Sequence, residues 1–354
     1  MDQQTGVIHK MQEDYIAYSR YLNVNPIDWL LEDSDPCVRY RTITELLDRE
    51  PSHTDYSRLL SAPQVRRLLN TENNGVLGDT VRFDLFYRGA MWCLAEAAEL
   101  GLDRKTGVVE NTARLVLDRY QLPSGGFTLN WKPLCEDACR TGFIMQALIR
   151  TGISDERIDR GIEWILRHQR HDGGWLHSPV LGGLDTLGLV LFKRAGRGLS
   201  AENDSSVKSG FEATAACAGA LAEYCRHKSH GPAEDALAGA AEFLLSAKLF
   251  TRGAPENTAG FAGNGCSSLG YPVLSGYTIL QGLYIAARAG LFHDPRTGEA
   301  FNIVMSKQDQ DGTWKLEQAR TGMLYGNFRK PPLGEKNRWI TFSVLKILKN
   351  AGHC

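Results

Sequence analysis

Small and aliphatic residues recur along the chain in stretches that each end at a glycine. A glycine at the end of a helix readily adopts the left-handed conformation that stops it, so each stretch predicts a helix. Because apolar positions occupy more than one side of these helices, we expect neighbouring elements to pack on both of their faces. The helices predicted in this way cover residues 87–101, 141–152, 186–196 and 275–290.

A second, amphipathic kind of helix follows the apolar kind. In residues 155–166, the isoleucines Ile158, Ile162 and Ile165 recur at helical spacing between largely charged positions. This pattern predicts a helix with one buried face and one face in solvent. Residues 294–304 repeat the pattern in a shorter form.

A short turn motif closes the amphipathic stretches. Residues 169–175 and 308–314 both read Gln-x-x-Asp-Gly-x-Trp, and Ser-Gly-Gly-Phe at 124–127 is a weaker copy. The glycines permit a tight bend, and the aromatic residue can wedge between neighbouring helices. The turn aromatics Phe127 and Trp175 are about 50 residues apart, a period typical of stacked two-helix repeats.

Stacked helical hairpins form either an open solenoid or a closed ring. The apolar helix of each unit suits an inner wall and the amphipathic helix suits an outer wall. We therefore predict an all-α fold in which residues 70–354 form an α/α toroid. Residues 1–69 lack the turn motif and resemble a HEAT-type helical unit, which predicts an N-terminal helical cap. A long exposed loop is expected over residues 198–210.

Composition and charge restrict the partners of the chain. Its 354 residues carry 40 basic and 41 acidic side chains, so no nucleic-acid-binding surface is expected. No stretch approaches the roughly 18–20 apolar residues of a membrane-spanning helix. The N-terminus lacks a basic region followed by an apolar one, which predicts a cytoplasmic protein whose eight cysteines are reduced.

The turn motifs resemble the repeat of terpenoid cyclases such as squalene–hopene cyclase. Protein prenyltransferase β subunits share the α/α toroid of that superfamily, and the resemblance covers residues 70–350. It implies a central cavity for a small apolar, isoprenoid-like ligand. The Asp-x-Asp-Asp motif with which triterpene cyclases protonate their substrate does not occur in the sequence, nor does the Asp-Asp-x-x-Asp motif of ionising terpene synthases. Because related toroids also carry cobalamin or form complement thioester domains, the fold alone does not assign a function.

The prenyltransferase β subunit gives a more specific resemblance. In that family a Gly-Gly-Phe turn precedes Asp-x-Cys at the start of an inner helix, and these two residues bind zinc together with a histidine from the next copy. Here the turn at 125–127 precedes Asp137 and Cys139. The matching place in the next copy holds Asp185, and the nearest histidine is His177. This departure counts against protein farnesylation, which would also require a partner α subunit.

The residues of this segment indicate a metal site on their own chemistry. Zinc favours thiolate, carboxylate and imidazole ligands in a tetrahedron. On a helix, Cys135 and Cys139 would share one face, and Asp137 would join them if the helix begins there. His177 or Asp185 would complete four ligands. The alternative is two small thiols that pack an inner helix and an acidic residue favoured by the helix dipole.

Aromatic and basic residues near the predicted inner wall form the candidate substrate-binding set. Aromatic faces can stabilise a carbocation, and basic side chains can hold a diphosphate or carboxylate group. Each residue also fits an ordinary place in the core or on the surface. The candidates are Tyr87, Arg88, Trp131, Arg140, Phe143 and Tyr277.

These patterns together predict a prenyltransferase- or terpenoid cyclase-like enzyme. Asp137, Cys139 and Asp185 are the expected catalytic set, and a zinc ion would activate a thiolate or polarise a leaving group. One alternative is a non-catalytic toroid that binds a ligand or a partner protein. Another is a carbohydrate-active α/α barrel, in which Asp137 and Asp185 would be the paired carboxylates.

Overall fold

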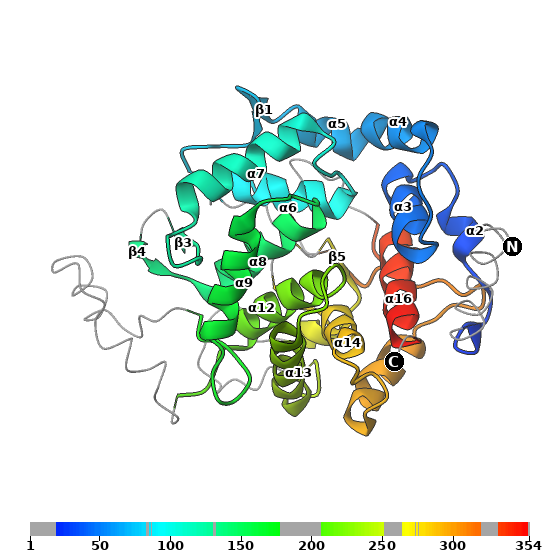
Figure 1. Ribbon diagram of the computed structural model, residues 1–354. Helices are drawn as coiled ribbons and strands as arrows, with labels where there is room; N and C mark the ends of the chain where they lie inside the picture. The colour runs from blue at the N-terminus through cyan, green and yellow to red at the C-terminus, as the bar shows by residue number, and fades with distance from the viewer. Residues whose placement is uncertain are drawn as a thin grey trace, which may run out of the picture. The chain divides into compact units, whose positions relative to one another are not determined.

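The computed structural model describes residues 19–82, 85, 87–129, 132–177, 207–250, 264–272, 274, 276–319 and 332–352. These residues are mostly helical, with three short pairs of strands (Figure 1). The chain divides into a central unit, residues 67–247 and 274–277, and a terminal unit, residues 1–66, 248–273 and 278–354. The predicted helical class is therefore confirmed. The closure of the helices into a toroid and the separate cap over residues 1–69 stay predictions.

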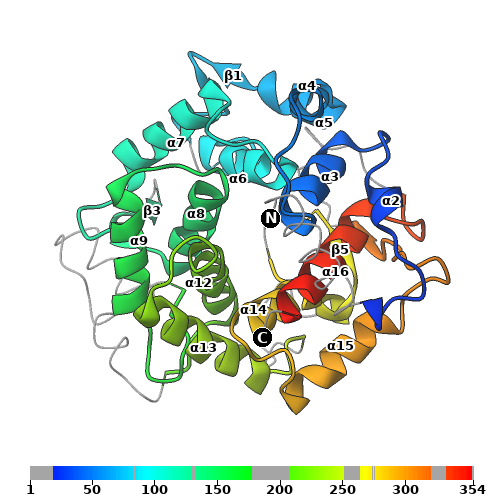
Figure 2. The same cartoon turned by 45° about the vertical axis from the view of Figure 1, so that its right-hand side comes forward.

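The central unit alternates two rows of helices. In Figures 1 and 2, α8 lies between α6 and α12, and α7, α9 and α13 run along one side of that row. The helices are α6 (Ala90–Leu100), α7 (Gly107–Tyr120), α8 (Ala138–Arg150), α9 (Glu156–Arg167), α12 (Phe211–Tyr224) and α13 (Gly231–Ser246). The strands are β1 (Glu72–Asn73), β2 (Val76–Leu77), β3 (Thr128–Leu129) and β4 (Lys132–Glu136), paired antiparallel as β1 with β2 and β3 with β4.

Burial separates the two rows as the sequence pattern predicts. Nearly every residue of α6 and of α12 is buried, whereas α9 buries one face that includes Ile158, Ile162 and Ile165. The glycines Gly101 and Gly152 follow α6 and α8 with φ angles of 91° and 70°. They therefore end these helices in the left-handed conformation that their position in the sequence indicates.

The second turn attaches the outer helix α9 to the next outer helix, α13. The Nε2 of Gln169 donates to the carbonyl oxygens of Gly173, within the turn, and of Ala236, in α13, at 2.9 and 2.7 Å. Gly173 has a φ of 83°, and a Cβ there would lie 2.2 Å from the carbonyl oxygen of Gly239. Only glycine permits both the backbone conformation and this close approach to α13.

The turn aromatics are fully buried and mark where each copy meets an inner helix. In every case a threonine hydroxyl four residues after the helix N-cap accepts the backbone N–H of the turn aromatic. The pairs are Phe127 with Thr141 at 2.9 Å, Trp175 with Thr214 at 3.1 Å, and Trp314 with Thr341 at 3.1 Å. These bonds make the starts of α8, α12 and α16 structurally equivalent.

Helices α8 and α12 pack closely and run in the same direction. A Cβ on Gly142 would lie 2.4 Å from the carbonyl carbon of Ala216, and one on Gly219 would lie 2.6 Å from the Gln146 side chain. The Nε2 of Gln146 also donates to the carbonyl oxygen of Ala216 at 3.0 Å. This contact fixes the register between the two helix starts.

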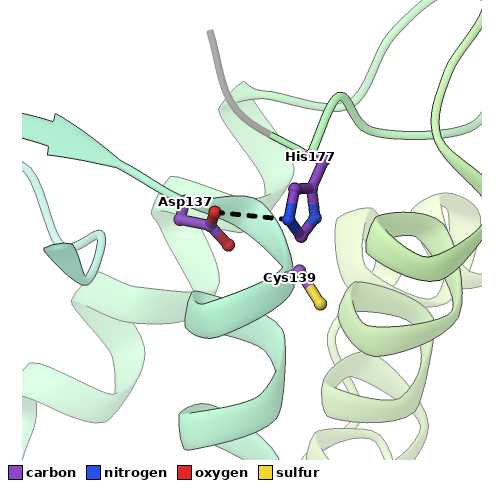
Figure 3. A group of neighbouring side chains, drawn as sticks. All are labelled: Asp137, Cys139 and His177. Atoms are coloured by element: carbon purple, nitrogen blue, oxygen red, sulfur yellow. Dashed lines mark ion pairs between the residues drawn. The ribbon is translucent and has the colours of Figure 1, made fainter. Parts of the chain in front are cut away.

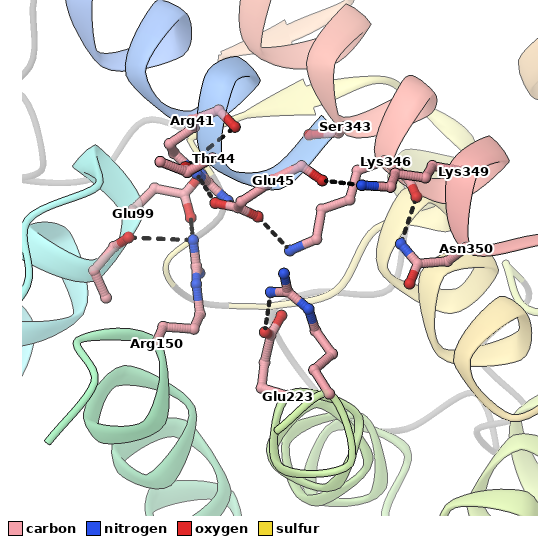
Figure 4. A network of polar contacts seen from close by, with 12 residues as sticks. Arg41, Thr44, Glu45, Glu99, Arg150, Glu223, Ser343, Lys346, Lys349 and Asn350 are labelled. Atoms are coloured by element: carbon pink, nitrogen blue, oxygen red, sulfur yellow. Dashed lines mark hydrogen bonds and ion pairs between the residues drawn. The ribbon is translucent and has the colours of Figure 1, made fainter. Parts of the chain in front are cut away.

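The terminal unit combines helices from both ends of the sequence. Its helices are α2 (Ile27–Leu30), α3 (Pro36–Arg41), η1 (Thr42–Leu46), α4 (His53–Ser61), η2 (Asn264–Ser267), α14 (Ile279–Arg288), η3 (Pro295–Thr297), α15 (Gly298–Met305) and α16 (Arg338–Ala351), and α5 (Pro63–Leu69) crosses the boundary. Strands β5 (Gly270–Tyr271) and β6 (Gln318–Ala319) pair in parallel. Glu45 of η1 forms an ion pair with Lys346 of α16 at 2.8 Å and a second one with Arg41, at the end of α3, at 2.6 Å (Figure 4).

No helix among the described residues has the length and apolar character needed to cross a membrane.

Candidate functional site

Asp137 starts helix α8 and is fixed by its own backbone and side chain. Its N–H donates to the carbonyl oxygen of Phe127 at 3.0 Å, which holds the helix start against the turn. Its Oδ1 accepts the N–H of Arg140 at 2.7 Å, as an N-cap residue does. The second carboxylate oxygen, Oδ2, is directed towards His177 (Figure 3).

Asp137, Cys139 and His177 form a three-residue cluster at this helix start. The Nε2 of His177 lies 3.8 Å from the Oδ2 of Asp137. One donor atom from each of the three side chains lies within 4.8 Å of the other two (Figure 3). Asp137 is buried, Cys139 is half-buried, and the His177 side chain is 62% exposed, so the cluster opens to solvent on the histidine side.

The second copy of the turn delivers His177 to this place. After the turn, the carbonyl oxygen of Trp175 accepts the N–H of Gly210 at 2.7 Å, so residues 175–177 run beside the start of α12. A Cβ on Gly210 would lie 3.6 Å from the backbone nitrogen of His177. Because α8 and α12 pack against each other, this segment carries His177 to the start of α8.

The surroundings of Cys139 keep its thiol protonated. Burial raises the pKa of Cys139 to about 12, and the negative charges of Asp137 and Glu212 act in the same direction. The guanidinium of Arg140 opposes them and lowers the pKa. A thiol of this kind is a poor nucleophile at neutral pH, but a bound cation would replace its proton.

A second thiol lies behind the cluster. Cys217 on α12 is fully buried, and its Sγ lies 3.4 Å from the carbonyl oxygen of Ala138. Burial raises the pKa of Cys217 well above its ordinary value. This thiol therefore packs α12 against the start of α8 as an inert group.

The donor set fits zinc. Thiolate, carboxylate and imidazole are its usual ligands, and three protein donors leave a fourth position for water or substrate, as in catalytic zinc sites. Bonds of about 2.0–2.3 Å in a tetrahedron place ligand atoms roughly 3.5 Å apart. The exposed His177 therefore needs only a small inward movement to close the site.

The prediction that Cys135 and Cys139 share a helical face is wrong. Cys135 belongs to strand β4, and the helix begins only at Ala138, because β4 pairs with β3 in a hairpin that follows the turn. Asp137 lies just before the helix, as its N-cap. The side chain of Cys135 lies outside the described residues, as does Asp185.

The equivalent of the Asp-x-Cys segment in the next copy lies later in the chain than the sequence suggested. The Thr141 and Thr214 hydrogen bonds make Gly210 equivalent to Asp137 and Glu212 equivalent to Cys139. The sequence pattern places this helix start near Asp185, about ten residues after the turn, and therefore does not indicate Glu212. The threonine four residues after the N-cap is the signal that would have located it.

Phe143, one helical turn beyond Cys139, belongs to a group of three aromatic rings. The ring centroid of Phe143 is 4.8 Å from that of Trp92, and the centroid of Trp92 is 4.9 Å from that of Tyr87. Tyr87 and Trp92 are buried, and Phe143 is half-buried. The structure therefore gathers the candidates Tyr87 and Phe143 around Trp92, at the starts of α6 and α8.

The other candidates for substrate binding are more scattered. Arg140 lies beside this group, with Nη1 3.7 Å from the sulfur of Met91. Tyr277 instead packs edge-on against Phe211 at the start of α12, with ring centroids 4.6 Å apart. Arg88 is exposed. Trp131 lies outside the described residues.

Comparison with known proteins adds little to this geometry. No protein-family model matches the sequence, and no curated protein matches it. A crystal structure of a protein from Actinoplanes is 17% identical, covering 83% of this chain and 99% of its own, with a TM-score of 0.29. A variant of the type II terpene cyclase MstE from Scytonema, in complex with its substrate geranylgeranyl dihydroxybenzoate, is 17% identical, covering 84% of this chain and 97% of its own, with a TM-score of 0.27. Apo MstE is 16% identical, covering 86% and 99%, with a TM-score of 0.26. Likeness at these TM-scores carries no inference about function.

Proposed function

We propose that this chain is a zinc-dependent transferase or cyclase that acts on an apolar, isoprenoid-like substrate. Asp137, Cys139 and His177 would hold the metal. The observation that supports this proposal best is the meeting of three different zinc-type donors from two copies of the repeat. The Asp-x-Cys resemblance to prenyltransferase β subunits, read from the sequence, points to the same residues.

Each protein donor has a defined part in this proposal. Asp137 uses one carboxylate oxygen to cap α8, which orients the other oxygen towards His177. Cys139 gives up its proton on metal binding, and the exposed His177 closes the site from the solvent side. When bound, zinc makes a coordinated thiol or water nucleophilic near neutral pH, or polarises a leaving group.

The substrate would lie along the aromatic group beside the metal ligands. The half-buried Phe143 follows Cys139 by one turn of α8, so an apolar chain that contacts this ring would place its reactive end near the cluster. The buried Trp92 packs against Phe143 and would hold its ring in place. Aromatic faces stabilise positive charge that develops on carbon. Arg140, at the same helix start, would bind a diphosphate or carboxylate group.

Native mass spectrometry of the full chain tests the metal and the ligand together. The unmodified protein is expected to carry one zinc ion, and Cys139→Ser and His177→Ala are expected to lose it. Two matched controls, Cys225→Ser at the C-cap of α12 and the exposed His171→Ala in the second turn, should retain it. A farnesyl or geranylgeranyl diphosphate added to the zinc form should appear as a bound species.

The second candidate function is a non-catalytic toroid that binds a ligand or a partner protein. The absence of both acidic cyclase motifs from the sequence favours it. An unmodified chain that retains a lipid or a partner protein but binds no zinc would refute the zinc enzyme and support this alternative.

A further inference from the structure

We propose that Glu212 is a fourth, displaceable protein donor of the same centre, which occupies the open metal position until a substrate nucleophile replaces it. This inference rests on the proposed function, since it concerns the same metal site. It adds a residue from helix α12 to a set that otherwise comes from the start of α8 and from the second turn.

The repeat places Glu212 at the same step of its helix as Cys139. Both residues are the second residue of an inner helix, after the N-caps Asp137 and Gly210. The threonine hydroxyls that bind the turn aromatics fix this equivalence independently of sequence spacing. Two consecutive copies therefore present a thiol and a carboxylate from corresponding positions.

The packing of the two helices brings these positions together. Gly142 of α8 lies directly against Ala216 of α12, and the helices run in the same direction. One turn before this contact, α8 reaches Ala138, next to Cys139, and α12 reaches Glu212. The two residues therefore lie level with each other on neighbouring helices.

The backbone before Glu212 also touches the third ligand. Gly210, two residues earlier, packs against the backbone nitrogen of His177. The Glu212 side chain is exposed on the first turn of α12.

The chemistry favours a weak and exchangeable donor. Carboxylate oxygen is an accepted zinc ligand alongside thiolate and imidazole. A long, exposed side chain loses torsional freedom when it binds, so a nucleophile from a substrate would displace it readily. The site would then be four-coordinate at rest and would exchange only the Glu212 donor during turnover.

Zinc affinity and cobalt spectra of the full chain test this inference without an activity assay. Competition against a chromophoric chelator should show that Glu212→Gln binds zinc about 10–100-fold more weakly than the unmodified protein. Glu234→Gln, which removes another exposed first-turn glutamate on α13, should stay within about twofold because it leaves every donor in place. The ligand-field bands of the Co²⁺ form should shift in Glu212→Gln, and the Cys139 thiolate-to-cobalt band should remain.

Glu212→Asp separates a donor from a mere neighbouring charge. The shorter side chain keeps the charge but reaches less far, so its affinity should stay below that of the unmodified protein. If Glu212→Asp binds zinc normally and the cobalt bands of Glu212→Gln do not shift, the donor role is wrong. A Glu212→Gln affinity equal to that of Glu234→Gln also overturns it.

These outcomes differ from a failure of the metal site itself. If the unmodified chain binds no zinc, the proposed function fails and this inference fails with it. If zinc binding depends on Cys139 and His177 but not on Glu212, the inference alone fails.

Discussion

Substitution of Asp137 separates its role in folding from its role in metal binding. Asp137→Asn keeps a side-chain oxygen that can accept the Arg140 N–H, whereas Asp137→Ala removes it. Asparagine and aspartate are about equally good N-cap residues, and alanine is a poor one. Both substitutions remove the carboxylate that faces His177.

The expected effects differ in size and in kind. Loss of an N-cap costs about 1 kcal/mol, so metal-free Asp137→Ala should unfold about 1 kcal/mol more easily than the unmodified protein. Asp137→Asn should lose only the favourable interaction of its charge with the helix dipole, at most about 0.5 kcal/mol for this single helix start. The binding free energy of zinc at a structural site with four ligands is about 10–16 kcal/mol, or roughly 3 kcal/mol for each ligand. Both variants lose one ligand, so they should bind zinc at least about 100-fold more weakly than the unmodified protein.

Two measurements on the same samples give these quantities. Urea unfolding in the presence of a chelator gives the free energy of unfolding without metal, and chelator competition gives the zinc affinity. Asn337→Ala is the matched control, because Asn337 caps the equivalent helix α16 by accepting the N–H of Ile340 at 3.0 Å. It should lose about 1 kcal/mol of stability and bind zinc normally.

The reasoning would be refuted in either of two ways. If Asp137→Asn is as unstable as Asp137→Ala without metal, the cap is not what the side chain contributes. If Asp137→Asn binds zinc as the unmodified protein does, its carboxylate is not a ligand.

Three further predictions follow from packing and from ionisation. Gly142→Ala should destabilise the protein by about 1–3 kcal/mol in urea unfolding, because its Cβ would overlap the α12 backbone, while Gly107→Ala, which meets open space, should not. In the metal-free protein at pH 8, Cys139 should react with iodoacetamide roughly 1000-fold more slowly than a thiol with the ordinary pKa of 9.0, because the pKa of Cys139 is about 12. Mass spectrometry of the labelled peptide measures this rate, and fast labelling would contradict the prediction. The hydrogen bond from Arg157 lowers the pKa of Asp155 to about 2, so Asp155 stabilises the fold at pH values above its ordinary pKa of 3.8, and this stability is lost as the pH falls towards 2. The difference in unfolding free energy between the unmodified protein and Asp155→Asn should vanish over that pH range, and a constant difference would refute this prediction.

The sequence was most informative about the turns and the helices that they join. Glycines such as Gly101 and Gly173 adopt the left-handed conformation that their places in the pattern indicate. The isoleucine stripe of α9 is buried as its spacing predicts. These features depend on residues within a few positions of one another, so a local pattern is sufficient to predict them.

The sequence was less informative about the spacing between a turn and the next inner helix, and about strand pairing. The N-cap of α8 follows Phe127 by ten residues, whereas that of α12 follows Trp175 by thirty-five. The number of residues between a turn and the next inner helix differs between the copies, so it cannot be inferred from the preceding copy. In the same way, Cys135 belongs to a hairpin strand whose partner is not visible in its own spacing.

By itself, the sequence determined the helical class, the repeated turns and the presence of a carboxylate and a thiol at one helix start. Only the tertiary structure decided that His177 is the histidine that meets them and that Glu212 lies level with Cys139. Helix periodicity and capping are short-range properties, encoded within a turn or two of chain. The meeting of Asp137 with His177 depends instead on the close approach of α8 and α12. Gly142 permits this approach because it has no side chain, and the residues that it contacts on α12 are more than seventy positions away in the sequence.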